Sequence, residues 1–274
     1  MTERPRVTLS APSKVFEGVG LHSGADASVC FRPASAGAGL TFRDRRSGQE
    51  IPARAANVTD TSRCTRLGWD ALEVQTVEHV LSALSGLGVD DALIEFEGGE
   101  MPAGDGSAAP FVALIREAGM HDQGTTVSAM TFGRPGMVTE GGSTIVVMPA
   151  DHFQATVILH YPDRPAIGTQ GVTYDPASED YGQTIAPART FGFLSEIEAL
   201  RARGLGLGAS YENAVVLNES GMCLNGLRFP NELARHKLLD LIGDLALIGQ
   251  PLQAHIIAIK PSHALNVRLA RLLS

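Results

Sequence analysis

The chain has 274 residues, a length that fits one or two domains, and 44% of them are hydrophobic while 19% are charged. This composition is typical of a folded globular protein and excludes a disordered one. The 30 acidic and 22 basic side chains leave a formal charge of −8, which argues against a nucleic-acid partner because phosphate backbones attract basic surfaces. The 3 cysteines form no CxxC pair, which excludes a disulfide scaffold and favours a reducing compartment.

The sequence predicts neither a signal peptide nor a membrane span. Its first residues lead into no apolar stretch. The most apolar region, residues 238–259, is too polar to cross a bilayer, because it is interrupted by Asp240, Asp244, Gly249, Gln250 and Pro251. We expect a cytoplasmic protein.

In the first half of the chain, short β-type runs precede two helical segments. β-Branched and aromatic residues bounded by Gly, Ser, Pro and Asp predict strands at residues 15–19, 27–31 and 40–42. Apolar residues at helical spacing predict a helix over 76–87, which two glycines end. A strand over 92–96 and a second helix over 107–118 follow.

The second half repeats this order of elements. Its β-type runs predict strands at residues 137–139, 144–148 and 154–160. A helix over 231–248, a strand over 254–259 and a helix over 262–273 follow. In each half a histidine, His79 or His236, lies near the start of the first long helix. The repeated order predicts an approximate duplication. The alternative is that the two halves have the same order of elements by chance, because alternation of strands and helices is common.

We therefore predict two α+β domains, residues 1–122 and 123–274. Residues 192–223 have no counterpart in the first half and form an insert, with a helix over 194–203 and a strand over 214–217. The glycine-rich run between that helix and strand formally matches a dinucleotide fingerprint. Because such a fingerprint must follow a strand and open a helix, we interpret the run as a flexible connection.

Three polar residues form a stripe on the helix over 231–248. His236, Asp240 and Asp244 are spaced four residues apart and share one face, while leucine and isoleucine surround them. A buried helix tolerates two carboxylates and an imidazole only when something pairs them, and a cation satisfies all three. His and Asp one turn apart commonly present two ligands to zinc. The alternative is a solvent-exposed polar stripe on an amphipathic helix.

Glu78 and His79 lie at the start of the equivalent helix in the first half. His79 could supply a third metal ligand, because it occupies the same place in the repeated unit as His236. Glu78 points about 100° away and could act on a water at the metal as a general base. The alternative for His79 is a core histidine with its own hydrogen-bond partner. The HExxH motif is absent, which excludes a zincin.

Two further segments carry groups suited to catalysis. His263 opens a helix directly after a predicted buried strand, and the carboxyl end of a strand is a frequent location for catalytic groups. Thr190 stands beside Phe191 and Phe193 at the entrance to the insert. Neither segment by itself indicates a function.

Taken together, these motifs match one known family in order along nearly the whole chain. The matching stretches are residues 18–24, 76–81, 105–110, 188–193, 221–229, 235–244 and 260–266. The sequence resembles the UDP-3-O-acyl-N-acetylglucosamine deacetylases, the zinc amidases of the committed step of lipid A synthesis in Gram-negative bacteria. The resemblance implies two duplicated α+β domains, each a sheet layer whose helices pack against those of the other domain, with a small insert in each.

The resemblance also implies a role for each candidate residue. One Zn²⁺ per chain is bound by His79, His236 and Asp240, Glu78 is the general base, and His263 is the general acid. The remaining expected site residues are Asp244, which orients that histidine; Thr190, which helps hold the oxyanion; Lys237 and Lys260, near the sugar and diphosphate; and Phe191 and Phe193, in substrate binding.

The two inserts are expected to have different tasks. The insert at 192–223 matches the segment that forms an apolar passage for the fatty acyl chain, and its Leu, Gly and Ala content suits an alkyl group. The first-domain insert, about residues 57–74, carries Arg63, Cys64 and Arg66, and we expect it not to touch the catalytic residues.

The expected reaction is zinc-dependent hydrolysis of the N-acetyl group of a UDP-acyl sugar, which yields acetate and the free amine. We expect a small-molecule substrate, no nucleic acid and a monomeric enzyme. Two alternatives remain open at this point: a zinc deacetylase of another acylated amine, and a non-catalytic relative that binds UDP-sugars or lipids.

Overall fold

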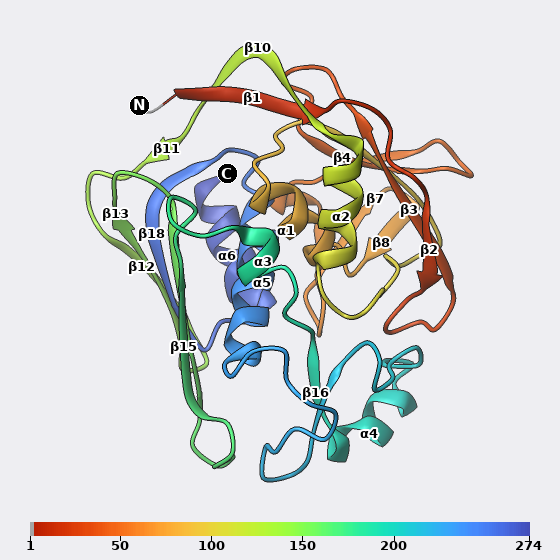
Figure 1. Ribbon diagram of the computed structural model, residues 1–274, viewed down its shortest axis with the longest axis vertical. Helices are drawn as coiled ribbons and strands as arrows, with labels where there is room; N and C mark the ends of the chain where they lie inside the picture. Colours follow the sequence, from red (N-terminus) through yellow and green to blue (C-terminus); the bar gives the residue numbers. More distant parts are fainter. Residues whose placement is uncertain (1–2) are drawn as a thin grey trace.

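The fold consists of two mixed β-sheets with helices between them. The computed structural model describes residues 3–274 and places the sheets on opposite sides of a central group of helices (Figure 1). This mixture of sheets and helices confirms the predicted α+β class. None of the helices in residues 3–274 has the length and apolar character needed to span a membrane.

The first sheet has the strand order β2-β3-β9-β4-β5. Its strands are β2 (Phe16–Val19), β3 (Asp26–Pro33), β4 (Leu40–Asp44), β5 (Glu50–Pro52) and β9 (Ala92–Glu97). Ala92, Ile94 and Phe96 alternate with less buried residues along β9, because successive side chains of a strand point to opposite faces. The apolar face of this strand therefore packs toward the helices.

The second sheet has the corresponding order β12-β13-β18-β14-β15. Its strands are β12 (Gly136–Glu140), β13 (Ser143–Pro149), β14 (Gln154–Tyr161), β15 (Gly168–Tyr174) and β18 (Leu252–Ile259), with the short β11 (Met130–Thr131) beside β18. β18 pairs parallel to β14 and antiparallel to β13, just as β9 pairs with β4 and β3. The two sheets thus share one topology.

Each long central helix is followed by a strand and another helix. The helices concerned are α1 (Glu78–Gly86) and α2 (Ala109–Ala118) in the first half, and α5 (Glu232–Ala246) and α6 (His263–Leu273) in the second. These elements confirm the helices predicted over 76–87, 107–118, 231–248 and 262–273, with small differences at their ends.

A two-stranded ribbon connects the halves. β1 (Glu3–Leu9) pairs antiparallel with β10 (Met120–Ser128), which is at the top of Figure 1. The boundary that we placed between residues 122 and 123 falls within β10, and its position stays a prediction.

Both inserts contain small sheets. The first consists of η1 (Ala55–Asn57), β6 (Val58–Asp60), β7 (Arg66–Trp69) and β8 (Leu72–Gln75). The second consists of β16 (Phe191–Phe193), η2 (Leu194–Glu196), α4 (Ile197–Ala202) and β17 (Val215–Leu217), preceded by the short α3 (Tyr181–Thr184). The helix and strand predicted in the second insert are confirmed, whereas the three strands of the first were not foreseen because each is only three or four residues long.

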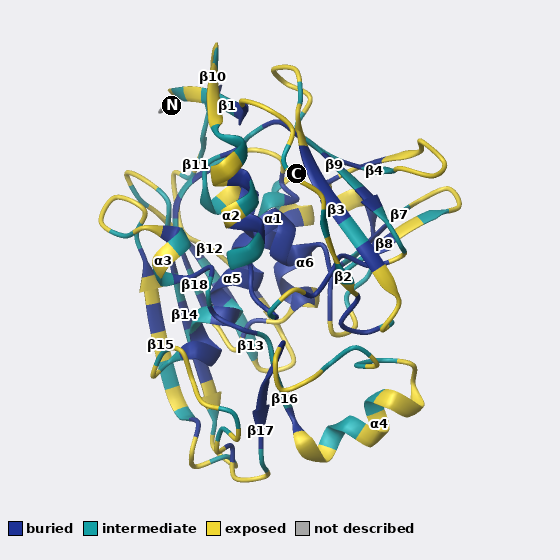
Figure 2. Ribbon diagram, turned by 45° about the vertical axis from the view of Figure 1, so that its right-hand side comes forward, coloured by how far each residue is buried: buried dark blue, intermediate teal, exposed yellow. Residues whose placement is uncertain are grey.

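The central helices α1 and α5 are in close contact, and both are largely buried (Figure 2). A Cβ at Gly243 of α5 would overlap the main-chain carbonyl of Glu78 on α1. The hydroxyl of Ser82 on α1 donates to the carbonyl of Leu239 on α5 at 2.7 Å and also lies 2.6 Å from the Tyr181 hydroxyl. The absence of a side chain at Gly243 therefore sets how near the two helices lie.

We predict that Gly243→Ala lowers the free energy of unfolding by about 1–3 kcal/mol, since overpacking forces close-packed elements apart. Thermal and urea denaturation would measure the loss. Gly133→Ala is the matched control, because a Cβ there meets no atom of the described part of the chain within 4 Å. Equal stability of the two variants would contradict the close packing at Gly243.

Candidate active site

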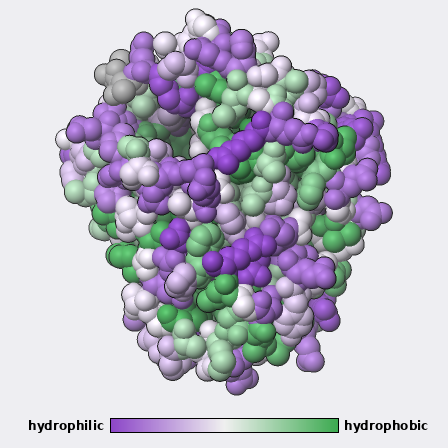
Figure 3. All heavy atoms as spheres, in the orientation of Figure 1, coloured by the Kyte–Doolittle hydropathy of each residue, from purple (hydrophilic) through white to green (hydrophobic). Residues whose placement is uncertain are grey.

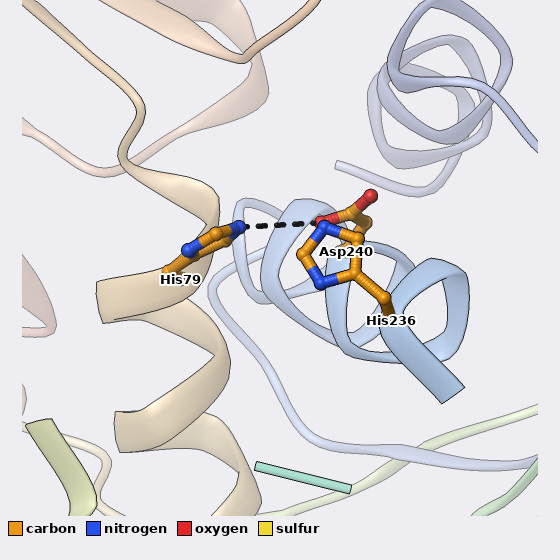
Figure 4. Close-up of side chains that lie close together, drawn as sticks. All are labelled: His79, His236 and Asp240. Atoms are coloured by element: carbon orange, nitrogen blue, oxygen red, sulfur yellow. Dashed lines mark ion pairs between the residues drawn. The ribbon is translucent and has the colours of Figure 1, made fainter. Parts of the chain in front are cut away.

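Three predicted metal ligands meet where α1 and α5 cross. His79 projects from α1 toward His236 and Asp240 on α5 (Figure 4). Their ligand atoms all lie within 4.8 Å of one another, and all three side chains are buried. Nε2 of His236 is 3.4 Å and Nε2 of His79 is 3.7 Å from Oδ1 of Asp240. These three residues form a group that could hold a metal ion.

The hydrogen bonds of Asp240 and His236 use the atoms that point away from the metal group. Among residues 3–274, Oδ1 of Asp240 is buried and has no hydrogen-bond partner, whereas Oδ2 accepts from Nζ of Lys237 at 2.7 Å. Nδ1 of His236 lies 3.1 Å from the carbonyl oxygen of Ala188. A proton on Nδ1 satisfies that carbonyl and leaves the Nε2 lone pair facing the group. A buried carboxylate oxygen without a donor costs free energy, and a cation would remove that cost.

The protonation states of the three residues also suit a cation. Burial and the neighbouring His236 lower the pKa of His79 to about 3. Burial lowers the pKa of His236 as well. Burial would raise the pKa of Asp240, but His236 and Lys237 outweigh it and lower that pKa. Two neutral imidazoles and one carboxylate are therefore present at neutral pH, which are the forms that bind a metal.

Glu78 lies beside the metal group at the first position of α1 and is buried. The main-chain N–H of Thr65 donates to its Oε2 at 3.0 Å, and its Oε1 is 3.9 Å from Nε2 of His263. Burial raises the pKa of Glu78 to about 8, with Asp240 and Asp244 adding to this effect and His263 opposing it. A cation in the adjacent group would stabilise the carboxylate and lower this pKa.

His263 and Asp244 form a buried pair. Nδ1 of His263 is 2.9 Å from Oδ2 of Asp244, which also accepts from the amide of Asn266 at 2.9 Å. Burial alone would lower the pKa of His263, but the charge of Asp244 and its hydrogen bond outweigh burial and raise that pKa to about 9. The structure thus places a protonated imidazole opposite Glu78.

Two residues of this network were missed by the sequence analysis. Asn266 follows His263 by three residues on α6, so helical spacing could have identified it. Thr65 donates from its hydroxyl to Oδ1 of Asp244 at 2.5 Å and belongs to the first insert. The expectation that this insert does not touch the catalytic residues is therefore wrong, because the turn before β7 enters the site.

Thr190, Phe191 and Phe193 lie on the segment beside His236. The N–H of Thr190 donates to the carbonyl of Gly106 at 2.8 Å, which ties this segment to the first half of the chain. The Phe191 ring packs edge-on against the His236 ring, and Nζ of Lys237 lies 5.5 Å from the centre of the Phe191 ring. Phe193 instead packs against Tyr161 and under Arg164.

Lys260 is exposed in the turn between β18 and α6. It adopts a left-handed backbone conformation with φ 52°, and its ammonium group is directed toward Gly142 of the β12–β13 hairpin. Its expected role near the substrate stays a prediction, as does that of Lys237, whose Nζ lies 2.7 Å from Oδ2 of Asp240.

A His₂Asp group with a buried carboxylate and a buried imidazole beside it is typical of metal-dependent hydrolases that activate water. The comparisons with known proteins identify the family. The family model described as "UDP-3-O-acyl N-acetylglycosamine deacetylase" matches residues 6–274. The chain belongs to this family, so the resemblance found in the sequence motifs and the expected class of enzyme, a deacetylase, are confirmed.

Curated relatives carry the corresponding name. A UDP-3-O-acyl-N-acetylglucosamine deacetylase of Myxococcus xanthus is 43% identical over 93% of this chain and 82% of its own length. Relatives of the same name from Syntrophotalea carbinolica and Leptospira biflexa are 41% and 40% identical, each over 94% of this chain, and over 84% and 86% of their own lengths. The similarity therefore extends across both halves and both inserts.

We predict that His79→Ala and His236→Ala each lower the affinity for a divalent metal by more than about 100-fold, since loss of an outer-shell partner alone costs roughly 10–100-fold. Titration against a chelator would measure the affinity. His255→Ala is the control, because this histidine lies on β18 and bonds to Thr156. Parental affinity in both ligand variants would exclude the metal group.

Proposed function

We propose that this chain is a zinc enzyme that hydrolyses the N-acetyl group of UDP-3-O-acyl-N-acetylglucosamine to UDP-3-O-acyl-glucosamine and acetate. This is the committed step of lipid A synthesis, and we propose that the enzyme acts as a cytoplasmic monomer. The observation that carries the chemistry is the unpaired, buried Oδ1 of Asp240 between two imidazoles, next to Glu78 and His263. Family membership supports the substrate.

Zinc suits the donor set of His79, His236 and Asp240, because two imidazoles and a carboxylate are common ligands of catalytic zinc. When bound there it would act as a Lewis acid that polarises the acetamide carbonyl and makes water more acidic.

Glu78 takes the proton from the attacking water at Oε1. Its other oxygen accepts from the N–H of Thr65, so the side chain is held in one orientation. A carboxylate whose pKa lies near the working pH is an efficient general base. Burial raises the pKa of Glu78 to about 8, and a cation held by His79, His236 and Asp240 would lower that pKa, so that Glu78 is ionised and can accept the proton.

His263 donates a proton from Nε2 to the departing nitrogen. Its Nδ1 is committed to Asp244, so the opposite ring nitrogen faces Glu78 and Asp240. Asp244 stabilises the imidazolium and fixes the ring plane. The two proton-transfer groups therefore lie on either side of the same space, with Nε2 of His263 3.9 Å from Oε1 of Glu78.

The remaining predicted residues would bind the substrate. We propose that the Thr190 hydroxyl donates to the developing oxyanion, that Lys237 and Lys260 bind the sugar and diphosphate, and that Phe191 and Phe193 contact the sugar and acyl chain. A few lysines can outweigh the net charge of −8 within a Debye length of about 8–10 Å.

The exposed apolar residues of the second insert support the proposal that this insert forms a passage for an acyl chain. Apolar side chains gather at the lower end of the molecule, where this insert lies (Figure 3). Its exposed large apolar residues are Leu194, Leu207, Tyr211 and Met222, and the exposed Leu224 and Leu227 follow directly after it. An alkyl chain lying along such side chains would remove apolar surface from water, which favours binding.

We predict that Glu78→Gln and His263→Ala each lower kcat by roughly 10²–10⁴-fold while the bound metal is retained, because neither residue belongs to the metal group. Acetate release from the UDP-acyl sugar and metal analysis of the same samples would test this. UDP-N-acetylglucosamine without the acyl chain is the control substrate. Near-parental rates in both variants, or equal turnover of both substrates, would contradict the proposal.

We predict that the rate falls as the pH rises through about 9. The pKa of His263 is raised to about 9, so the imidazolium is present below that value and is lost above it. The pH profile of kcat would show an alkaline decrease in the parent enzyme and none in His263→Ala. An unchanged alkaline decrease in the variant would assign it to another group.

A further inference from the structure

We propose that Thr65 is a positioning residue that fixes the orientation of the general base, Glu78, relative to the general acid, His263. This inference rests on the proposed function. Thr65 lies in the first insert, between β6 and β7, and its exposed fraction is 0%. It contacts Glu78, Asp244 and His263, yet it is none of the metal ligands.

The two polar groups of Thr65 serve different catalytic partners. Its main-chain N–H donates to Oε2 of Glu78 at 3.0 Å, and its hydroxyl donates to Oδ1 of Asp244 at 2.5 Å. Each carboxylate thereby has one oxygen occupied by Thr65. The other oxygen of Glu78 is free to face His263, and the other oxygen of Asp244 accepts from His263.

These partners come from different halves of the chain. Glu78 begins α1, whereas Asp244 lies on α5 and His263 begins α6. Carboxylates can rotate about their terminal bonds, so packing of the helices alone leaves their oxygen positions open. Bonds from one residue to both carboxylates fix those positions relative to each other.

The position of Thr65 is fixed by contacts of the turn in which it lies. Its carbonyl accepts from the N–H of Val77, the residue directly before α1, at 3.3 Å. Two residues before Thr65, Arg63 has a positive φ of 72°, the left-handed conformation that is typical of tight turns. Arg63 also forms an ion pair with Glu196 of the second insert at 2.9 Å. The turn is therefore connected to both halves of the molecule.

The hydroxyl of Thr65 is the part that can be tested separately. Thr65→Val removes the hydroxyl but keeps the size of the side chain and the N–H bond to Glu78, whereas Thr65→Ser keeps the hydroxyl. Thr8→Val is a matched control, because Thr8 is also buried and its hydroxyl donates to the carbonyl of Asp91 at 2.7 Å. Thr65→Ala replaces the valine variant if valine prevents folding.

We expect Thr65→Val to lower kcat by roughly 10–100-fold, the range found when a partner behind a reacting group is removed. KM and metal content should stay at parental values, since Thr65 has no exposed surface to touch substrate and is not a ligand. Thr65→Ser should restore most of the rate, and Thr8→Val should match the parent in rate even where it loses stability.

A spectroscopic measurement separates positioning from general destabilisation. The Nδ1 proton of His263, hydrogen-bonded to Asp244, should give a downfield proton NMR signal that is identified by its absence in His263→Ala. We expect this signal to move in Thr65→Val and to stay in place in Thr65→Ser and Thr8→Val.

An unchanged kcat together with an unmoved signal in Thr65→Val would overturn the inference, as would equal rate losses in Thr65→Val and Thr8→Val. A parent enzyme that releases no acetate would refute the proposed function. The NMR signal would then decide alone whether Thr65 positions the Asp244–His263 pair.

Discussion

The close crossing of α1 and α5 is the constraint on which the site depends. Gly243 allows α5 to lie against the carbonyl of Glu78, and this brings His79 of one helix to His236 and Asp240 of the other. A larger residue at the crossing would separate these three side chains, because helices move as rigid units. The same contact buries the ionisable groups, so packing and electrostatics are coupled at this point.

Burial then divides these ionisable groups into opposite roles. It keeps the imidazoles of His79 and His236 neutral and raises the pKa of Glu78, whereas Asp244 keeps His263 protonated. The proposed base and the proposed acid both have shifted pKa values and lie close together, with Nε2 of His263 3.9 Å from Oε1 of Glu78. The three imidazoles therefore differ in charge because their burial and their charged neighbours act together.

The predictable part of the site lies on helices. The spacing of His236, Asp240 and Asp244 specifies one helix face, and the repeated order of elements related His79 to His236. Thr65 could not be found in this way, because its bonds to Asp244 and His263 join residues 179 and 198 positions apart. The strands around it are too short to show a period, so neither its turn nor its neighbours could be placed from the sequence.

The duplicated architecture explains why the two inserts matter. Two sheets with one topology supply equivalent helices, and these helices carry the candidate metal group, the proposed base and the proposed acid. The proposed base, Glu78, begins α1 of the first half and the proposed acid, His263, begins α6 of the second, so the side chains of the equivalent helices already differ. The inserts differ in composition and position. The first reaches the proton-transfer pair through Thr65, and the second presents apolar side chains after Thr190. The inserts therefore add to a difference between the halves that the side chains at the starts of α1 and α6 already establish.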